Sequence, residues 1–369
     1  MGKTVPDVAK KEKNIQLLTE LGESLYSQLE RDKIPEIKIT LRSTSNLVLD
    51  KVQGRYVLGK RQVSRKASSV TELRTLNQMV ILCNFLMGVL SKREQVTARE
   101  LYYSLNSVIK NGINYGFTNQ DESNSLLKDL EVLFNCKKED LGVVSEESGA
   151  AIFGPIKFYD NIDKVKVDCS LYSEGYTIPA NPDKLSIKES EAKLILMIET
   201  HGSFRRVART IKQGKAPTLQ RMNPILLSTK GMPSRAVRMI ANRLHKELKL
   251  PALMLTDNDL GGVRIFTVSK FGAAESAHLP ELSIPELIHV NHPKDILKYN
   301  LPYTNMPAKR VTDFQRLSKD VRVRENPELL QRVEDFIAIK KEAEIEAMAS
   351  KNLYFLAEEF LPKRVKEFT

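Results

Sequence analysis

The chain has 369 residues, of which 41% are apolar, enough to fill two or three hydrophobic cores and more than one core usually holds. Lys and Arg total 57 against 46 Asp and Glu, a formal charge of +11 that favours an acidic polymer, nucleic acid above all, as partner. We expect an intracellular protein without membrane contact, because the sequence shows neither an apolar run of roughly 20 residues nor a signal-peptide core. Three scattered cysteines argue against a disulfide framework or a zinc site: Cys83, Cys136 and Cys169.

Residues 1–69 are expected to form an N-terminal basic extension. The segment Lys51–Lys66 concentrates basic side chains, namely Arg55, Lys60, Arg61, Arg65 and Lys66. Such a cluster is either a solvated, partly ordered arm or a contact with the DNA backbone. The sequence does not decide between the two.

Residues 70–150 are predicted to be mostly helical. Apolar residues recur at helical spacing from Val70 to Leu90, and Thr97 with Glu100 has the spacing of a capping box that starts a second helix. A third helical stretch covers Asp121–Phe134 and is followed by short apolar segments. Short helices joined by turns in this order favour a winged helix-turn-helix (CAP-like) DNA-binding domain.

The rest of the chain is predicted to be α/β, with linking strands over 151–188 and an α/β domain over 189–369. The unbroken apolar runs Leu194–Ile198 and Ala252–Leu255 are typical of buried parallel strands. Between them we expect a strand and then an amphipathic helix, over Pro224–Ser228 and Ser234–Leu248. This alternation predicts a doubly wound, mostly parallel sheet.

Three acidic residues follow the two apolar runs. Glu199 comes directly after the first run, and Asp257 and Asp259 follow the second, so all three are expected at the edge of the sheet where open α/β folds bind ligands. Two or three carboxylates suffice for Mg²⁺, which keeps several waters and is completed by phosphate. An Asp-x-Asp pair is equally typical of helix caps and solvated turns.

Tyr103 lies in the helix that the capping box starts, four residues after Arg99. A tyrosine in a helix is usually a core aromatic. A phenol attacks phosphorus at neutral pH only with help, because little of it is ionised. Arg99, on the same helical face, would stabilise either a phenolate or the phosphate in the transition state.

The segment Thr97–Tyr103 resembles the Arg-acidic-apolar-Tyr-Tyr motif of topoisomerase VI A subunits and of the related meiotic proteins that make double-strand breaks. The resemblance continues in order through Leu127–Glu131, Leu141–Val144, Gly175–Pro179, Thr229–Arg235, Asp257–Asp259 and Lys341–Ala347. It therefore covers the chain from about residue 70 to its end.

The resemblance implies a winged-helix domain that presents Tyr103 as nucleophile and a Toprim domain that binds Mg²⁺ through Glu199, Asp257 and Asp259. The chain departs from the family pattern twice. It has Thr200 where the family has a lysine, and Leu260-Gly261-Gly262 where the family has a proline and an aromatic residue. These departures put the efficiency of the reaction in doubt rather than its type.

The implied reaction is a transesterification, in which the tyrosine attacks a DNA phosphate and a sugar hydroxyl later reverses the step. Four basic residues near the acidic edge are candidate phosphate contacts, with solvated surface charge as the alternative: Arg206, Lys230, Arg235 and Arg238.

The resemblance also implies a two-fold homodimer, in which the tyrosine of one protomer works with the metal site of the other on double-stranded DNA. No G-x-x-x-x-G-K-[ST] loop is present, so ATP is expected to bind a partner, a GHKL-type ATPase B subunit in an A2B2 heterotetramer. Two alternatives stay open: a meiotic-type protein that breaks DNA without resealing it, and a noncatalytic winged-helix DNA-binding protein.

Overall fold

The computed structural model describes residues 5–110, 113–144 and 150–368. The chain folds into two compact units, which we describe separately. The first comprises residues 1–48, 57–146 and 274–279, and the second comprises residues 49–56, 147–273 and 280–369.

The first unit is mainly helical. Its helices are α1 (Val5–Glu30), α2 (Val70–Lys92), α3 (Ala98–Leu105) and α4 (Gln120–Phe134). Its strands are β1 (Glu36–Thr40), β4 (Gln62–Lys66), β5 (Val96–Thr97), β6 (Ile109–Lys110), β7 (Ile113–Asn114) and β8 (Val143–Val144), while β2 (Leu47–Asp50) and β3 (Arg55–Leu58) pair where the units divide. The three helices predicted between residues 70 and 134 are confirmed, including the capping box of α3.

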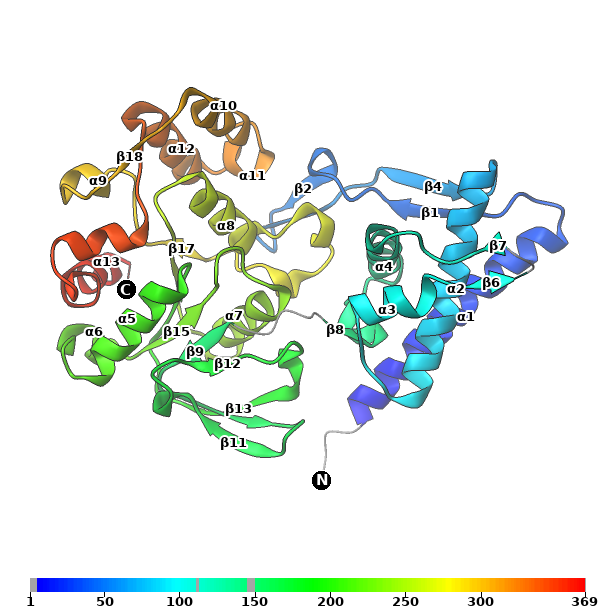
Figure 1. Ribbon diagram of the computed structural model, residues 1–369, viewed down its shortest axis with the longest axis horizontal. Coiled ribbons are helices and arrows are strands. Elements are labelled where there is room, and N and C mark those ends of the chain that lie inside the picture. The colour runs from blue at the N-terminus through cyan, green and yellow to red at the C-terminus, as the bar shows by residue number, and fades with distance from the viewer. Residues whose placement is uncertain (1–4, 111–112, 145–149, 369) are drawn as a thin grey trace. The chain divides into compact units, whose positions relative to one another are not determined.

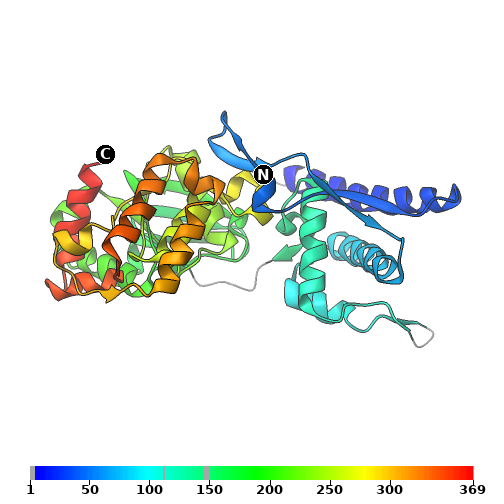
Figure 2. The same cartoon turned by 90° about the horizontal axis from the view of Figure 1, so that it is seen from above.

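Helix α2 is the centre of this unit's core. Its buried face includes Met79, Leu82 and Leu86, and it packs on α1, whose Leu18 and Leu25 belong to the same apolar cluster (Figures 1 and 2). By length and composition α2 is the one helix among the described residues that would reach across a membrane. Its burial within this cluster is typical of a core helix in a soluble protein.

The N-terminal basic segment is part of the folded unit. Strand β4 pairs with β1 in antiparallel register. Arg65 on β4 and Arg42 both bond the buried carboxylate of Asp129, at 2.8 and 2.6 Å. These two arginines therefore neutralise a buried charge on α4, a role that a solvated arm would not have.

The second unit is α/β. Its strands are β9 (Ala151–Phe153), β10 (Ile156–Asp160), β11 (Val165–Asp168), β12 (Tyr176–Thr177), β13 (Leu185–Ser190), β14 (Leu194–Ile198), β15 (Pro224–Ser228), β16 (Ala252–Leu255), β17 (Ile288–His289), β18 (Thr304–Asn305) and β19 (Lys341–Glu342). Its helices are α5 (His201–Lys212), α6 (Pro217–Arg221), α7 (Arg235–Leu248), α8 (Leu260–Phe271), α9 (Asp295–Lys298), α10 (Ala308–Leu317), α11 (Val321–Arg324), α12 (Pro327–Ile339) and α13 (Leu361–Lys366), with the shorter helical turns η7 (Ile345–Ser350) and η8 (Leu356–Phe360).

The central sheet of this unit has the strand order β12-β9-β15-β14-β16-β17 in the described part of the chain. The last four strands run parallel, and β9 and β12 add an antiparallel edge. The parallel strands, the strand Pro224–Ser228 and the helix after it are thus confirmed. A separate antiparallel sheet, β11-β10-β13, is formed by the predicted linking strands.

Alternate residues of the buried strands face opposite sides of the sheet. Leu194, Leu196 and Ile198 of β14 join a cluster with α5, α6, η8 and α13, while α7 also packs on β14 (Figure 1). Both faces are covered, which is why β14, β15 and β16 are continuously apolar.

Candidate active site

The predicted acidic residues lie at the carboxyl ends of two adjacent strands. Glu199 follows β14, and Asp257 and Asp259 follow β16, whose parallel register pairs Ile198 with Leu255. The chain leaves β14 for β15 on one side and returns to β16 on the other, so the acids flank the point where the strand order reverses. Open α/β sheets bind their ligands at such a point.

Each of the three carboxylates accepts one backbone hydrogen bond. The Asp257 N–H donates to Oε2 of Glu199 at 2.9 Å, and the Ile345 N–H donates to Oδ1 of Asp257 at 2.7 Å. The Gly262 N–H donates to Oδ1 of Asp259 at 2.7 Å, which makes Asp259 the N-cap of α8. Three backbone groups therefore orient the three side chains, and each carboxylate has a second oxygen that can serve as a ligand.

Burial and mutual repulsion raise the pKa of two of these acids. Desolvation raises the pKa of Glu199 to about 7, and the neighbouring charges of Asp257, Asp259 and Glu346 add to the shift. Desolvation likewise raises the pKa of Asp257 to about 6, with further contributions from Asp259, Glu346 and Glu344. The site is thus a partly buried cluster of negative charge that a cation would stabilise.

The turn from β16 into α8 requires glycine at one position. A Cβ on Gly262 would lie 2.1 Å from the Asp257 carbonyl oxygen and 2.7 Å from the Thr256 hydroxyl. Because no side chain fits there, Gly262 allows α8 to start close enough for Asp259 to cap it.

A buried asparagine that the sequence did not single out supports the same turn. Asn291 donates to the Thr256 carbonyl at 2.7 Å and to Oδ1 of Asn258 at 2.9 Å, and it accepts from the Thr256 N–H at 3.1 Å. It therefore fixes the residue before Asp257 and the residue between the two aspartates. Its sequence neighbourhood carries no recognisable pattern, so only the tertiary contacts reveal this role.

Two of the four predicted phosphate contacts are exposed. Arg206 is exposed on α5, where its neighbours Arg205 and Arg209 both pair with Glu174. Lys230 is exposed on the turn after β15, in the left-handed region at φ 53°.

The turn that carries Lys230 is bonded to the backbone of Glu199, because the Gly231 N–H donates to the Glu199 carbonyl at 3.0 Å. The other two predicted contacts are half-buried on α7. Arg235 begins that helix, and Arg238 has its Nε and Nη1 atoms out of solvent. The structure thus places Lys230 at the acidic edge and leaves Arg238 poorly exposed for phosphate.

Tyr103 lies in the first unit, on α3, and its side chain is 57% exposed. The guanidinium of Arg99 lies over its ring, 5.8 Å from the centroid. The neighbouring Tyr102 is held instead, because its hydroxyl donates to the Thr118 carbonyl at 3.3 Å. Of the two adjacent tyrosines, Tyr103 is the one exposed and accompanied by a cation, so the alternative of a core aromatic does not hold for it.

The donor set at the acidic edge fits a hard divalent cation, since it consists of carboxylate oxygens around a charge cluster. Within the described residues, no three His, Cys, Asp or Glu side chains are already gathered as a complete ligand set. Magnesium does not need one, because it usually binds through one or two carboxylates and fills its shell with water and phosphate.

Comparison with known proteins matches almost the whole chain. The family model for the Toprim domain shared by Spo11 and the A subunits of topoisomerase 6 matches residues 194–365, the model for type IIB DNA topoisomerases matches residues 74–143, and the model for the all-beta domain of the DNA topoisomerase VI alpha chain matches residues 146–191. The A subunit of type 2 DNA topoisomerase 6 from Methanocaldococcus jannaschii is 33% identical over 98% of this chain and 98% of the relative. The proteins of the same name from Natronomonas pharaonis and Methanosarcina barkeri are each 32% identical, over 95% and 99% of this chain and 94% and 97% of their own lengths.

Proposed function

The chain belongs to the family of type 2 DNA topoisomerase 6 A subunits and is the DNA-cleaving subunit of a type IIB topoisomerase, and we propose that Tyr103 is its nucleophile. The observation that carries this assignment is the exposure of Tyr103 beneath the Arg99 guanidinium. The enzyme is an isomerase, because each strand it cuts is rejoined after duplex passage.

In the proposed step the Tyr103 hydroxyl oxygen attacks a DNA phosphorus. A phosphotyrosyl bond forms while the bond to one sugar oxygen breaks, and that oxygen leaves as a hydroxyl once it has taken up a proton. The reverse attack by the same hydroxyl restores DNA and tyrosine, so neither direction consumes ATP. Arg99 stabilises the negative charge that develops on the phenolic oxygen and on the phosphate.

Toprim domains generally bind a divalent metal ion, and we propose that Glu199, Asp257 and Asp259 hold Mg²⁺ in this chain. The backbone bonds to each carboxylate and the raised pKa values of two of them support this assignment. When bound, Mg²⁺ neutralises charge on the phosphate oxygens. Lys230 and Arg206 are the proposed DNA phosphate contacts that exposure supports best, whereas Arg235 and Arg238 are weaker candidates.

The helices α2, α3 and α4 with the β6–β7 pair are proposed to form the winged-helix domain that carries Tyr103, within residues 70–150. Residues 189–369 are proposed as the Toprim domain with its C-terminal helices, joined by the linking strands 151–188. The partners proposed from the family are double-stranded DNA, a second copy of the chain, and a GHKL-type ATPase B subunit in an A2B2 assembly. Action on DNA favours an intracellular, nucleoid-associated location.

The nucleophile is tested by trapping covalent protein–DNA complexes with denaturant, using the chain assembled with its ATPase partner and Mg²⁺. We expect Tyr103→Phe to lower covalent attachment by more than about 10³-fold while DNA binding persists, because only the reacting oxygen is lost. Tyr102→Phe is the matched control and should retain attachment. A label that maps to Tyr102, or attachment that persists in Tyr103→Phe, would sink the assignment.

The same assay separates the alternatives. A noncatalytic DNA-binding protein gives no covalent complex at any Mg²⁺ concentration. A break-forming protein of the meiotic type gives the complex but fails to reseal DNA when Mg²⁺ is restored after dilution.

A further inference from the structure

The C-terminal segment Lys341–Ser350, which we call the strap, is bonded along the turn that carries the two aspartates. Asn258 and Ala343 exchange two backbone hydrogen bonds, at 2.8 and 3.0 Å. The Leu260 N–H donates to Oε1 of the buried Glu342 at 3.3 Å. Together with the bond from the Ile345 N–H to Asp257, these contacts hold the strap against one half of the acidic edge.

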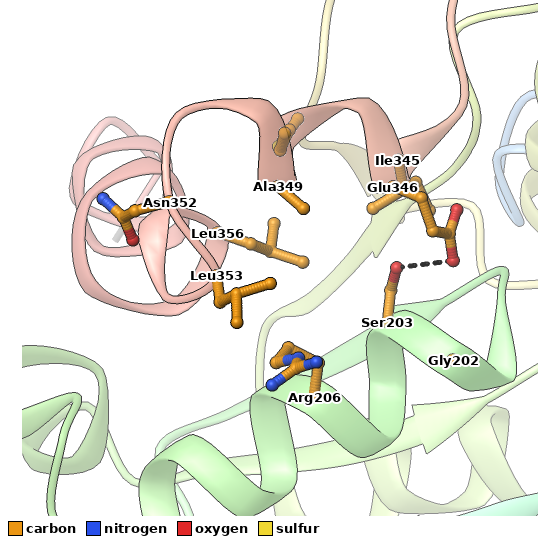
Figure 3. A pocket seen from close by; sticks show the side chains of 10 residues that line it. Gly202, Ser203, Arg206, Ile345, Glu346, Ala349, Asn352, Leu353 and Leu356 are labelled. Carbon is orange, nitrogen blue, oxygen red and sulfur yellow. Dashed lines mark hydrogen bonds between the residues drawn. The ribbon is translucent and has the colours of Figure 1, made fainter.

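Glu346 extends the strap to the other half of the edge. Its Oε1 accepts hydrogen bonds from the Thr200 hydroxyl at 2.6 Å and from the Ser203 hydroxyl at 2.9 Å (Figure 3). Thr200 is the N-cap residue of α5 but makes no side-chain capping bond within its own helix. Its hydroxyl is therefore committed to the strap, one residue after Glu199.

We propose that Glu346 is a positioning residue, which acts through the Thr200 hydroxyl to hold Glu199 in place for Mg²⁺; this inference rests on the proposed function of Glu199. The strap then ties the end of β14 to the turn after β16, so that carboxylates from two strands keep a fixed separation. Partners that orient the ligands of a metal in this way commonly govern its affinity.

The two departures from the family pattern coincide with the strap's contact points. At one of them the Thr200 hydroxyl reaches Glu346. At the other, the Leu260 N–H reaches Glu342, a bond that a proline could not donate. In this chain both positions therefore bond a glutamate of the strap, which links the two acid-bearing turns through one segment.

A purely electrostatic role for Glu346 can be separated from positioning, because the strap holds a matched glutamate. Glu344 and Glu346 are both exposed, and both charges raise the pKa of Asp257. Glu344 makes no side-chain capping bond in η7, whereas Glu346 bonds both hydroxyls of α5. Removal of Glu344 thus removes a similar charge but leaves the link to Thr200 intact.

The experiment measures Mg²⁺ binding by calorimetry on the intact chain, together with the thermal midpoint in EDTA and DNA cleavage at saturating Mg²⁺. We expect Glu346→Ala and Thr200→Val each to weaken Mg²⁺ binding by about 10-fold, with cleavage largely restored at saturating Mg²⁺. Glu344→Ala should weaken binding by less than about 3-fold, as expected for an exposed, screened charge. Glu346→Gln keeps an oxygen that accepts both hydroxyls and should recover most of the affinity lost in Glu346→Ala.

Equal losses in Glu344→Ala and Glu346→Ala, or unchanged Mg²⁺ binding in Thr200→Val, would overturn the positioning role. A lowered thermal midpoint with unchanged Mg²⁺ affinity would also overturn it, since that is the result of a merely structural contact. If Glu199→Gln abolishes Mg²⁺ binding but Glu346→Ala does not change it, only this inference fails. If the wild-type chain binds no Mg²⁺ at all, the proposed metal site fails with it.

Discussion

At the scale of single residues, the acidic edge is arranged against the stability of the metal-free protein. Glu199 is only 8% exposed, and it lies near two other carboxylates. Folding therefore moves this group from water into a site where its charged form is disfavoured. Such a cost persists in a fold when the charge is needed for binding, which is the reason to test stability and metal binding together.

The first prediction at this scale is that Glu199→Gln stabilises the chain in EDTA while it abolishes DNA cleavage. The pKa of Glu199 is raised from 4.5 to about 7 in the folded state, so the folded protein holds this proton more tightly than the unfolded chain. The stability that this proton contributes is complete below pH 4.5 and is lost as the pH rises to about 7. At pH 8 the amide variant, which does not titrate, should exceed wild type by roughly 1–3 kcal/mol in unfolding free energy.

The measurement is urea unfolding of both proteins in EDTA from pH 4.5 to pH 8 and again with saturating Mg²⁺. The difference should open between about pH 4.5 and pH 7 and then stay constant. Mg²⁺ should stabilise wild type and reverse the order. A difference that does not change with pH, or a variant that Mg²⁺ stabilises as much as wild type, would contradict the predicted site.

At the scale of elements, the sequence was most informative where local pattern and tertiary burial agree. The apolar runs Leu194–Ile198 and Ala252–Leu255 are fully buried strands in parallel register, as predicted from their composition. The capping box at Thr97 and Glu100 starts α3 as expected, because its two hydrogen bonds depend only on residues three apart. The position of the acids at strand ends followed from the same patterns.

What the sequence did not show depends on contacts between distant residues. The pairing of β1 with β4 joins residues that are at least 22 positions apart, the distance from Thr40 to Gln62, and Arg65 finds its partner on α4. Asn291 and Glu346 support the acidic edge across 33 and 146 residues of sequence. No local periodicity records such contacts, so these supports emerged only from the folded structure.

The second prediction concerns the support that Asn291 gives to the turn after β16. Asn291→Ala removes three hydrogen bonds and leaves the buried Thr256 backbone unpaired, which should cost about 2–3 kcal/mol of unfolding free energy. Asn242→Ala is the matched control, since Asn242 is also buried in the same unit but bonds Pro280 and Ser283. Both variants should unfold earlier in urea, whereas only Asn291→Ala should need about 10-fold more Mg²⁺ for half-maximal cleavage. Equal Mg²⁺ requirements in the two variants would reduce Asn291 to a structural residue.

At the scale of the whole molecule, the proposed nucleophile and the proposed metal ligands belong to different compact units. Tyr103 lies in the first unit, and Glu199, Asp257 and Asp259 lie in the second. One active site therefore needs both units, from one chain or from two. A two-fold dimer that shares its sites would cut both strands of a duplex, whose backbones are themselves related by two-fold symmetry.

The last prediction is that the sites are shared between two protomers, and mixing two inactive variants tests it. Each variant alone lacks a group at every site. In a heterodimer of Tyr103→Phe with Glu199→Ala, a shared arrangement gives one site both defects and leaves the other site intact. That intact site should nick one strand, at up to about half the wild-type number of sites. Sites built within single protomers would each retain one defect, and the mixture would be as inactive as its parents. The readout is single-strand nicking by the mixture with the ATPase partner and Mg²⁺, after differently tagged protomers have been purified together, so that an absence of nicking by proven heterodimers assigns each site to a single chain.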